Sequence, residues 1–456
     1  MGKIKTLTIL LSLTILLNSI NVTAFQENIK ECQIDLILSK ASLDEIDGVR
    51  ILTVKGSYYE MGFQQGHLLK YECRKNIRAL IYKNEQFGFT YSQLLSFWNE
   101  SKNYIPQKYV DELHGIADGA EVSFYDVAAI QVCFNFIILM DCFGFVAWDD
   151  ATKSKKLIQV RSTDLPFDFQ DPVTGNFAHE NQFLLVRKPD EGYASVAPCI
   201  AGFTNLAAGI NEKMVGIAAH LSGSKDQSHM GPPLRIRTQM AIDESLNADE
   251  AIDIILCNKT LGFCLLVSDA KTNNGYAIEI SANHSYVGTW NNSVESNYPF
   301  WSIKNVVRRT NFFISPEMAQ YQRNRYNPGG LIGILKAFFA ALKEFFTPGN
   351  DPYYNPNLIY PIWRNYKIMS RQIDKKWGNL DLQNALQILR ETYNGKNDVL
   401  LKIMGKFGKN HGFLVSWNQW AVCPETGDLF VSFADRNNYA SKNPIHQFNI
   451  YELLAL

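Results

Sequence analysis

The sequence predicts an α+β fold, a layered sandwich in which two antiparallel β-sheets are flanked by helices. Three observations predict it. The first part of the 456-residue chain has mostly helical periodicity, the period changes to two after residue 142, and helical segments return late in the chain. No repeat and no low-complexity linker divides the chain, and 46% hydrophobic residues suffice for a large core.

The N-terminus predicts export. Lys3 and Lys5 precede the apolar run "LTILLSLTILL", and the small residues "VTA" end at Ala24. This pattern is typical of a cleaved signal peptide over 1–24, with a mature chain starting near Phe25. An uncleaved anchor helix is the alternative, although the apolar run is short for a membrane span. We therefore expect a secreted or lumenal, extracytoplasmic protein.

Composition excludes some classes of function. The chain has 44 basic and 45 acidic side chains, so neither its net charge nor the distribution of that charge indicates nucleic-acid binding. The eight cysteines contain no CxxC pair, which argues against a zinc site, and leave the disulfide pattern open. Glycosylation sequons, which fit a secreted surface, occur at Asn99, Asn258, Asn283 and Asn291.

The segment 25–141 is predicted to be mostly helical. Its expected elements are a strand over 47–56, a helical stretch over 58–84 and two helices within 106–140, broken at Gly119 with Ser123 as the second N-cap. The last stretch ends in an apolar run over 127–140 that carries polar Gln131 and Asn135. It is too short for a membrane span and indicates a buried helix.

From Cys142 the pattern is that of strands. "CFGFVAW" alternates, "DDATKSKK" turns and "LIQVRSTD" returns, which predicts an antiparallel hairpin over 142–164. Further strands are expected over 182–188, 193–198, 206–220, 262–270 and 275–281, with a second hairpin over 411–435 and helices over 248–256 and 380–393.

One stretch, 319–360, does not fit the sandwich. Its centre, 331–346, reads "LIGILKAFFAALKEFF" and predicts a helix with a wide apolar face. Two interpretations stay open. The helix packs like any other, or it forms a lid or membrane-surface helix over an apolar substrate site.

Known catalytic motifs are missing, and attention falls on Cys142. The chain contains no GxxxxGK, GxGxxG, HExxH or GxSxG motif, and its eight histidines show no ligand spacing. A lone cysteine is usually an inert core residue, and no papain-like pattern surrounds this one. However, cleavage of the Asp141–Cys142 bond would give Cys142 a free α-amine with a pKa of about 7.7 to 8.0, suited to act as general base for its own thiol.

The hairpin sequence carries a family resemblance. "CFGFVAWDDATKSKKLIQVRSTDLPFD" resembles the start of the mature catalytic chain in N-terminal-nucleophile hydrolases of the acyl-coenzyme A:6-aminopenicillanic acid acyltransferase family, relatives of choloylglycine hydrolases and acid ceramidases. The resemblance implies a four-layer αββα fold, a pro-segment over 25–141 and a catalytic domain over 142–456 with an insertion near 319–360. It also implies that Asp164 is a catalytic aspartate and Arg161 its neighbouring arginine.

Other stretches match the same family. "VKGSYYEMGFQQGHLLK" and "YVDELHGIADGAEVSFYDV" are similar to its pro-segment, and "GFTNLAAGINEKMVGIA" to its strand pair. "RRTNFF" places Asn311 as an oxyanion or positioning residue, and "WRNYKIMSRQ" places Arg364 as a basic substrate contact. The plain alternatives are a turn carboxylate for Asp164, an ion-pair partner for Arg161, a loop cap for Asn311 and a solvated Arg364.

Departures from the family pattern also occur. Phe143 follows the cysteine where Ser or Thr is usual, and Phe313 stands where His is common. The asparagine donor expected after the strand pair is absent, so His220 or Ser222 would donate instead.

The resemblance implies a self-cleaving amidohydrolase. Cys142 would attack the amide carbonyl of a small N-acyl substrate, and water or an amine would resolve the thioester, making the enzyme a hydrolase or an acyltransferase. Asp164 would orient the α-amine, and Arg161 would set the local charge or bind a substrate carboxylate. No metal or cofactor is needed, and two self-derived chains would remain together. The rival hypotheses are a non-catalytic exported protein that binds lipid or peptidoglycan fragments, and a thiol or lipid esterase.

Overall fold

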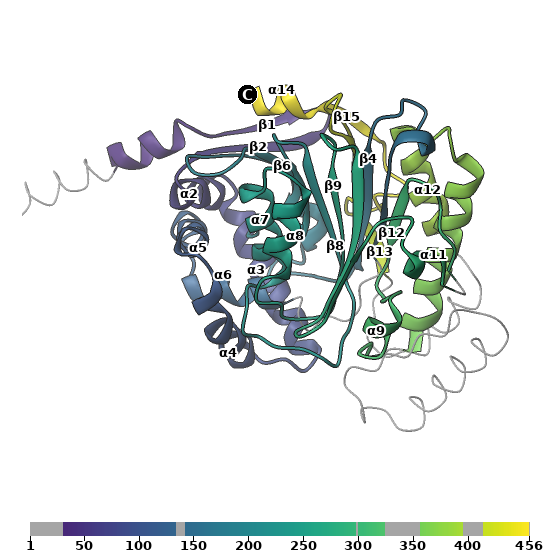
Figure 1. The fold of residues 1–456 in the computed structure, drawn as a ribbon. Helices are drawn as coiled ribbons and strands as arrows, with labels where there is room; N and C mark the ends of the chain where they lie inside the picture. Colours follow the sequence, from purple (N-terminus) through teal and green to yellow (C-terminus); the bar gives the residue numbers. More distant parts are fainter. Residues whose placement is uncertain (1–30, 134–141, 298–299, 324–355, 395–413, 456) are drawn as a thin grey trace, which may run out of the picture.

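The computed structural model describes residues 31–133, 142–297, 300–323, 356–394 and 414–455. Two sheets lie face to face in the middle of the molecule, with helices on both outer sides (Figure 1). This four-layer arrangement confirms the predicted fold class. The predicted signal peptide over 1–24, Asp141 and the apolar segment over 331–346 lie outside the described residues.

The nine-stranded sheet has the strand order β1-β2-β5-β6-β7-β8-β9-β10-β11. Its pairs are antiparallel, except that β2 and β5 run parallel, which the prediction of antiparallel sheets did not include. Parallel strands need a long connection, and here most of the segment before Cys142 and the first hairpin separate the two. The strands are β1 (Ser42–Ile46), β2 (Val49–Gly56), β5 (Gln182–Pro189), β6 (Ser195–Ile200), β7 (Ala208–Asn211), β8 (Val215–Leu221), β9 (Phe263–Asp269), β10 (Asn274–Ile280) and β11 (Ser285–Gly288).

The six-stranded sheet has the order β12-β3-β4-β13-β14-β15 and is antiparallel throughout. Its strands are β3 (Phe143–Ala147), β4 (Ile158–Pro166), β12 (Val306–Arg309), β13 (Leu414–Cys423), β14 (Asp428–Phe433) and β15 (His446–Asn449). Both predicted hairpins are confirmed, β3 with β4 and β13 with β14.

Helices cover the outer face of each sheet (Figure 1). Beside the nine-stranded sheet lie α2 (Tyr58–Leu68), α3 (Lys70–Gln86), α4 (Tyr91–Ser101), α5 (Gln107–Ala120), α6 (Phe124–Val132), α7 (Leu234–Glu244) and α8 (Ala248–Leu256). Beside the six-stranded sheet lie α11 (Pro356–Lys376) and α12 (Leu382–Asn394), and the short helices are α9 (Pro316–Ala319) and α14 (Ile450–Ala455). Ser123 caps α6 as predicted, since its hydroxyl accepts from Tyr125 N at 3.2 Å. No helix within the described ranges combines the length and the apolar character that crossing a membrane requires.

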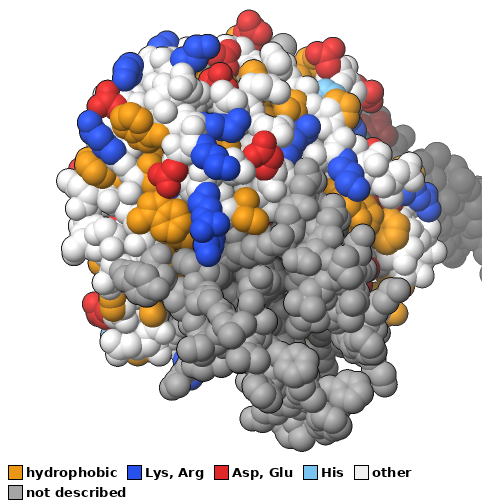
Figure 2. Space-filling view, turned by 90° about the vertical axis from the view of Figure 1, so that its right-hand side faces the viewer, with side chains coloured by type: hydrophobic (Ala, Val, Ile, Leu, Met, Phe, Trp, Pro, Cys, Tyr) orange, Lys and Arg blue, Asp and Glu red, His pale blue; other side chains and the backbone are white. Residues whose placement is uncertain are grey.

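Apolar side chains fill the space between the layers. Ile217 belongs to the cluster that joins the nine-stranded sheet to its helices. Val146 belongs to the cluster between the sheets, and Phe145 to the one against α11 and α12. Burial of one such side chain stabilises the fold by about 1.5–3 kcal/mol. Over the described part of the face in Figure 2, basic and acidic side chains are interspersed.

Glycines let α2 and α5 approach closely. A Cβ atom at Gly62 would lie 2.0 Å from the carbonyl oxygen of Glu112, and one at Gly119 would lie 2.3 Å from that of Phe63. Any larger side chain at these two positions would push the helices apart. The glycines therefore fix where α5 stands over the sheet.

A buried ion cluster joins this helix pair to the rest of the chain. Arg187 on β5 donates to both carboxylate oxygens of Glu112 on α5, and its Nη2 lies 3.2 Å from Asp243 Oδ2 on α7. Tyr58 on α2 donates to the same oxygen of Asp243 at 3.1 Å. The charged side chains are at most 1% exposed. The cluster thus connects residues on both sides of the predicted cleavage point.

Candidate active site

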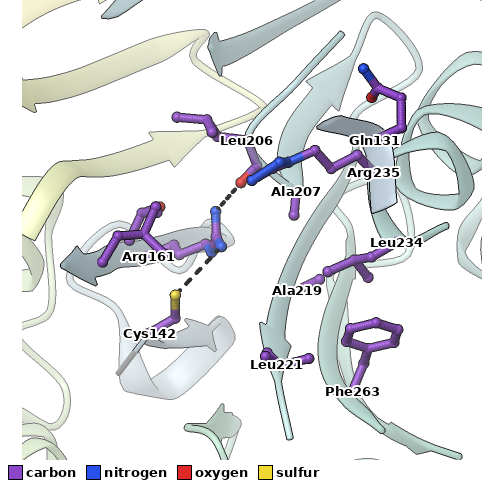
Figure 3. A pocket seen from close by; sticks show the side chains of 12 residues that line it. Gln131, Cys142, Arg161, Leu206, Ala207, Ala219, Leu221, Leu234, Arg235 and Phe263 are labelled. Atoms are coloured by element: carbon purple, nitrogen blue, oxygen red, sulfur yellow. Dashed lines mark hydrogen bonds between the residues drawn. The ribbon is translucent and has the colours of Figure 1, made fainter. Parts of the chain in front are cut away.

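Cys142 immediately precedes β3 and lines a pocket (Figure 3). Its side chain is buried, with 1% exposed. Arg161 Nη2 donates to Cys142 Sγ at 3.8 Å, and Sγ lies 3.9 Å from the main-chain oxygen of Asp164. A guanidinium beside a thiol favours its thiolate form, which is the nucleophilic one.

Strand alternation sets the direction of the thiol. Phe143 and Phe145 pack toward α11 and α12, so Cys142 and Gly144 face the opposite side of the sheet. Gly144 is required there, because a Cβ atom would lie 2.3 Å from the Val160 oxygen and 3.4 Å from His220 Nε2. The second residue of the strand must therefore be glycine for β3 and β4 to pair closely beside the thiol.

Arg161 on β4 is held by the turn before β7. Its Nη1 donates to the Leu206 oxygen at 2.6 Å. That carbonyl is oriented by Ala207, which has a left-handed φ of 58°, and Ala207 N donates to Asn205 Oδ1 at 2.6 Å. An αL conformation costs a non-glycine residue roughly 1–2 kcal/mol, and the asparagine turn offsets part of it. Burial lowers the pKa of Arg161 below its ordinary value, while Cys142 acts in the opposite direction.

Asp164 is fully buried near the end of β4. Ser162 Oγ donates to its Oδ1 at 2.6 Å, and Gln419 Nε2 donates in turn to Ser162 Oγ at 3.2 Å. Its main chain contacts the Cys142 thiol, as described above. The carboxylate is therefore oriented by β4 and β13. Its strand neighbours Thr163 and Leu165 line the pocket and Asp164 does not, and the printed contact with Cys142 Sγ is made by the Asp164 main-chain oxygen.

Asn311 lies in a bend two residues after the end of β12 and is not among the pocket-lining residues. The ladder pairs Arg309 with Gly144, so the same register, if extended by two residues, would place Asn311 opposite Cys142. Asn311 Nδ2 donates to the Leu221 oxygen at 2.6 Å. An amide NH₂ carries two N–H groups, so this bond occupies one of them and orients the other.

The other predicted site residues lie elsewhere. His220 is buried on β8, beside Gly144, on the strand face opposite to its pocket-lining neighbours Ala219 and Leu221. Burial, reinforced by nearby Arg161, holds the pKa of His220 well below its ordinary value, so the ring is neutral. Ser222 donates to Gln322 Oε1 at 3.3 Å and is not among the pocket-lining residues. Arg364 lies on α11, with its side chain outside the described part.

The pocket also contains residues that sequence reasoning missed. Its lining is mostly apolar, with Arg235 of α7 and Gln131 of α6 as added polar groups: Gln131, Cys142, Arg161, Thr163, Leu165, Leu206, Ala207, Ala219, Leu221, Leu234, Arg235 and Phe263. Nothing local in the sequence marked α7 as part of the site. Among the described residues, no group of three or more His, Cys, Asp or Glu is placed to hold a metal ion.

No protein-family model matches the chain. An uncharacterised protein of Archaeoglobus fulgidus is 25% identical over 321 residues, which cover 60% of this chain and 51% of the relative. Protein dcd1A of Dictyostelium discoideum is 24% identical over 267 residues, which cover 51% of this chain and 58% of the relative. The chain thus spans between half and three-fifths of the curated relatives that it matches.

Solved structures show a weaker likeness. The N-acylethanolamine-hydrolyzing acid amidase ortholog of Caenorhabditis elegans is 11% identical with a TM-score of 0.37, over 68% of this chain and 99% of that one. Penicillin V acylase of Agrobacterium tumefaciens is 12% identical with a TM-score of 0.38, over 68% and 87%. A mutant of the conjugated bile acid hydrolase of Clostridium perfringens is 14% identical with a TM-score of 0.34, over 68% and 96%. At these scores the likeness carries no argument about the chemistry of this chain.

Proposed function

We propose that the protein is a self-cleaving cysteine amidohydrolase in which Cys142 becomes an N-terminal nucleophile. The observation that carries the proposal is the position of Cys142: it directly precedes a strand, lines a pocket and accepts a hydrogen bond from buried Arg161 at 3.8 Å. The main-chain oxygen of Asp164 on β4 lies 3.9 Å from its thiol, and Asn311 follows the other neighbouring strand, β12. A core cysteine without a function would need neither the pocket nor the cation.

The first step of the proposal is self-cleavage. Cys142 Sγ attacks the carbonyl carbon of Asp141, the C–N bond to Cys142 breaks, and the acyl group moves from nitrogen to sulfur. Water then opens the thioester, which leaves a carboxylate on Asp141 and a free α-amine on Cys142. This amine titrates near neutral pH in model peptides, so it can serve as general base beside its own thiol.

Turnover repeats the same chemistry on a substrate. The α-amine takes the thiol proton, Sγ attacks the amide carbonyl, and the developing oxyanion accepts from the second N–H of Asn311. The α-amine returns the proton to the leaving amine as the C–N bond breaks. Water, or another amine in an acyl transfer, then resolves the thioester. Asp164 orients the α-amine and stabilises its charged form while it carries the proton.

Export and a stable two-piece product belong to the same proposal. The four sequon asparagines, Asn99, Asn258, Asn283 and Asn291, are exposed, so glycans would have room there. The pieces before and after the cut would stay together through the β2–β5 pair and the cluster around Arg187. We also propose that 331–346 contacts apolar substrates or a membrane surface.

Labelling with an acylating probe tests the function directly. Purified protein treated with a thiol-directed acyl probe should carry one label per molecule, on the N-terminal cysteine of the larger fragment. The same protein should release the amine from an N-acyl amide faster than the alcohol from the matched ester. Absence of any Cys142-specific label would support a non-catalytic binding protein, and a preference for the ester would indicate an esterase.

Asp164→Asn should reduce turnover by at least about 100-fold while the protein still folds, because a neutral amide does not hold a charged amine. The measurement is kcat on cut protein, with thermal unfolding as the check on folding. Ser162→Ala, two residues away on the same strand, is the matched control. It removes the 2.6 Å hydrogen bond to Asp164 together with the 3.2 Å hydrogen bond that Ser162 Oγ accepts from Gln419, and it should lower kcat about tenfold or less. Wild-type kcat in Asp164→Asn would remove this residue from the mechanism, and loss of folding would make its role structural.

A further inference from the structure

We infer that Arg161 and Arg235 form a carboxylate-binding subsite in the Cys142 pocket, so that the preferred amides carry a carboxylate close to the scissile carbonyl. The inference rests on the proposed function and adds the chemical class of the substrate. Arg235 comes from α7, which lies far from the catalytic hairpin in the sequence and which the sequence analysis did not predict.

The two guanidinium groups reach the pocket from different layers. Arg161 extends from β4 and Arg235 from the first turn of α7, and both point toward Leu206 (Figure 3). Arg235 is 5% exposed, and its guanidinium lies 4.1 Å from the centre of the Phe203 ring. Its main-chain oxygen accepts from Asn205 Nδ2 at 3.0 Å, so the turn that holds Arg161 also holds α7.

The charge of the pocket favours an anion. Among the described residues that line it, two are arginines and none is acidic. Burial lowers the pKa of Arg235 to about 10, so this group stays protonated at neutral pH. A buried cation gains most from charge-assisted hydrogen bonds, and a carboxylate matches the planar fork of a guanidinium. Apart from Cys142, Gln131 and Thr163, the rest of the lining is apolar, which matches a carbon skeleton beside the carboxylate.

The carboxylate can lie on either side of the scissile bond, and the pocket chemistry is the same in both cases. On the amine side the substrate is an N-acyl amino acid. On the acyl side it is the monoamide of a dicarboxylic acid. Two matched pairs distinguish them: N-butyrylalanine against N-butyrylalaninamide, and succinyl p-nitroanilide against the same anilide with a terminal carboxamide.

The subsite is tested by measuring kcat/KM for these four compounds with the self-cleaved protein that retains both fragments. In at least one pair the acid should exceed the carboxamide in kcat/KM by about 10- to 100-fold. Arg235→Gln should abolish that preference and Arg235→Lys should retain most of it. Equal kcat/KM for acid and carboxamide in both pairs, or a preference that survives Arg235→Gln, would overturn the inference.

Arg237→Gln is the matched control. Arg237 is also buried on α7, but it donates to main-chain carbonyls at the end of α8, including the Ile255 oxygen at 3.0 Å, and it does not line the pocket. Its loss should lower the melting temperature and leave the preference unchanged. If wild-type protein hydrolyses no amide, the proposed function fails. Calorimetric titration with the same compounds then still decides the subsite, since the acid must bind at least about tenfold more tightly than the carboxamide.

Discussion

Cys142→Ala is expected to give one uncut chain without any turnover. The alanine has no nucleophile for the Asp141 carbonyl, so neither the α-amine nor the smaller fragment forms. Wild-type protein should instead separate on a denaturing gel into two pieces, and N-terminal sequencing of the larger one should begin at Cys142. Intact mass of both proteins makes the comparison quantitative.

Two variants control this experiment. Cys142→Ser should cleave more slowly, because a hydroxyl reaches its anionic form far less readily than a thiol. Cys423→Ala removes another buried cysteine, on β13 and not part of the pocket lining, and should remain cut and active. A fully active, uncut wild-type chain would refute the mechanism, because Cys142 would then have no amine of its own to act as base.

Arg187→Gln is expected to destabilise the protein by about 3–5 kcal/mol. The substitution leaves the carboxylates of Glu112 and Asp243 buried together without their cation. Although burial alone would lower it, these two neighbours raise the pKa of Arg187 above its ordinary value, so the guanidinium stays charged. Burial raises the pKa of both carboxyl groups above their ordinary values, and the charge of Arg187 opposes that shift. Equilibrium unfolding in urea gives the difference in free energy, best on the uncut Cys142→Ala background.

Lys155→Gln provides the comparison. Its ion pair with Asp150 spans 2.9 Å, but the Lys155 side chain is 61% exposed, so its removal should leave the unfolding midpoint unchanged within error. The triple variant Arg187→Met, Glu112→Gln, Asp243→Asn should recover part of the stability by removing every charge of the cluster. A loss below about 1 kcal/mol in Arg187→Gln would show that water or rearrangement compensates the two carboxylates.

Sequence periodicity predicted those helices and strands whose pattern is visible within the segment itself. The hairpin after Cys142 and the helix over 248–256 were located within a residue or two, because alternation and capping are local properties. Strands β1, β11, β12 and β15, each of four or five residues, were missed. The parallel pairing of β2 with β5 could not be deduced, because partner choice between distant strands depends on the assembled core.

The candidate site was predictable only in part. Cys142, Arg161 and Asp164 belong to one hairpin, so their proximity follows from its register. Asn311 joins them through the register of β12, and in the sequence only the family pattern singled it out. Arg235 carried no local signal, because its place in the pocket depends on where α7 packs. His220 was predicted as a donor at the site, but the pocket is lined by its neighbours Ala219 and Leu221. Because side chains alternate along β8, the His220 side chain points to the opposite face of the strand.

The β2–β5 ladder has a consequence for the lifetime of the protein under the proposed cleavage. Strand β2 precedes the proposed cleavage point and β5 follows it, so the sheet would be continuous across two polypeptides if Asp141 and Cys142 separate. An uncut chain that unfolds can refold by a first-order process. After the cut, unfolding releases two molecules that must meet again, and the yield of renaturation falls with dilution. The proposed cleavage of a single peptide bond would thus make the lifetime of the protein depend on its unfolding rate.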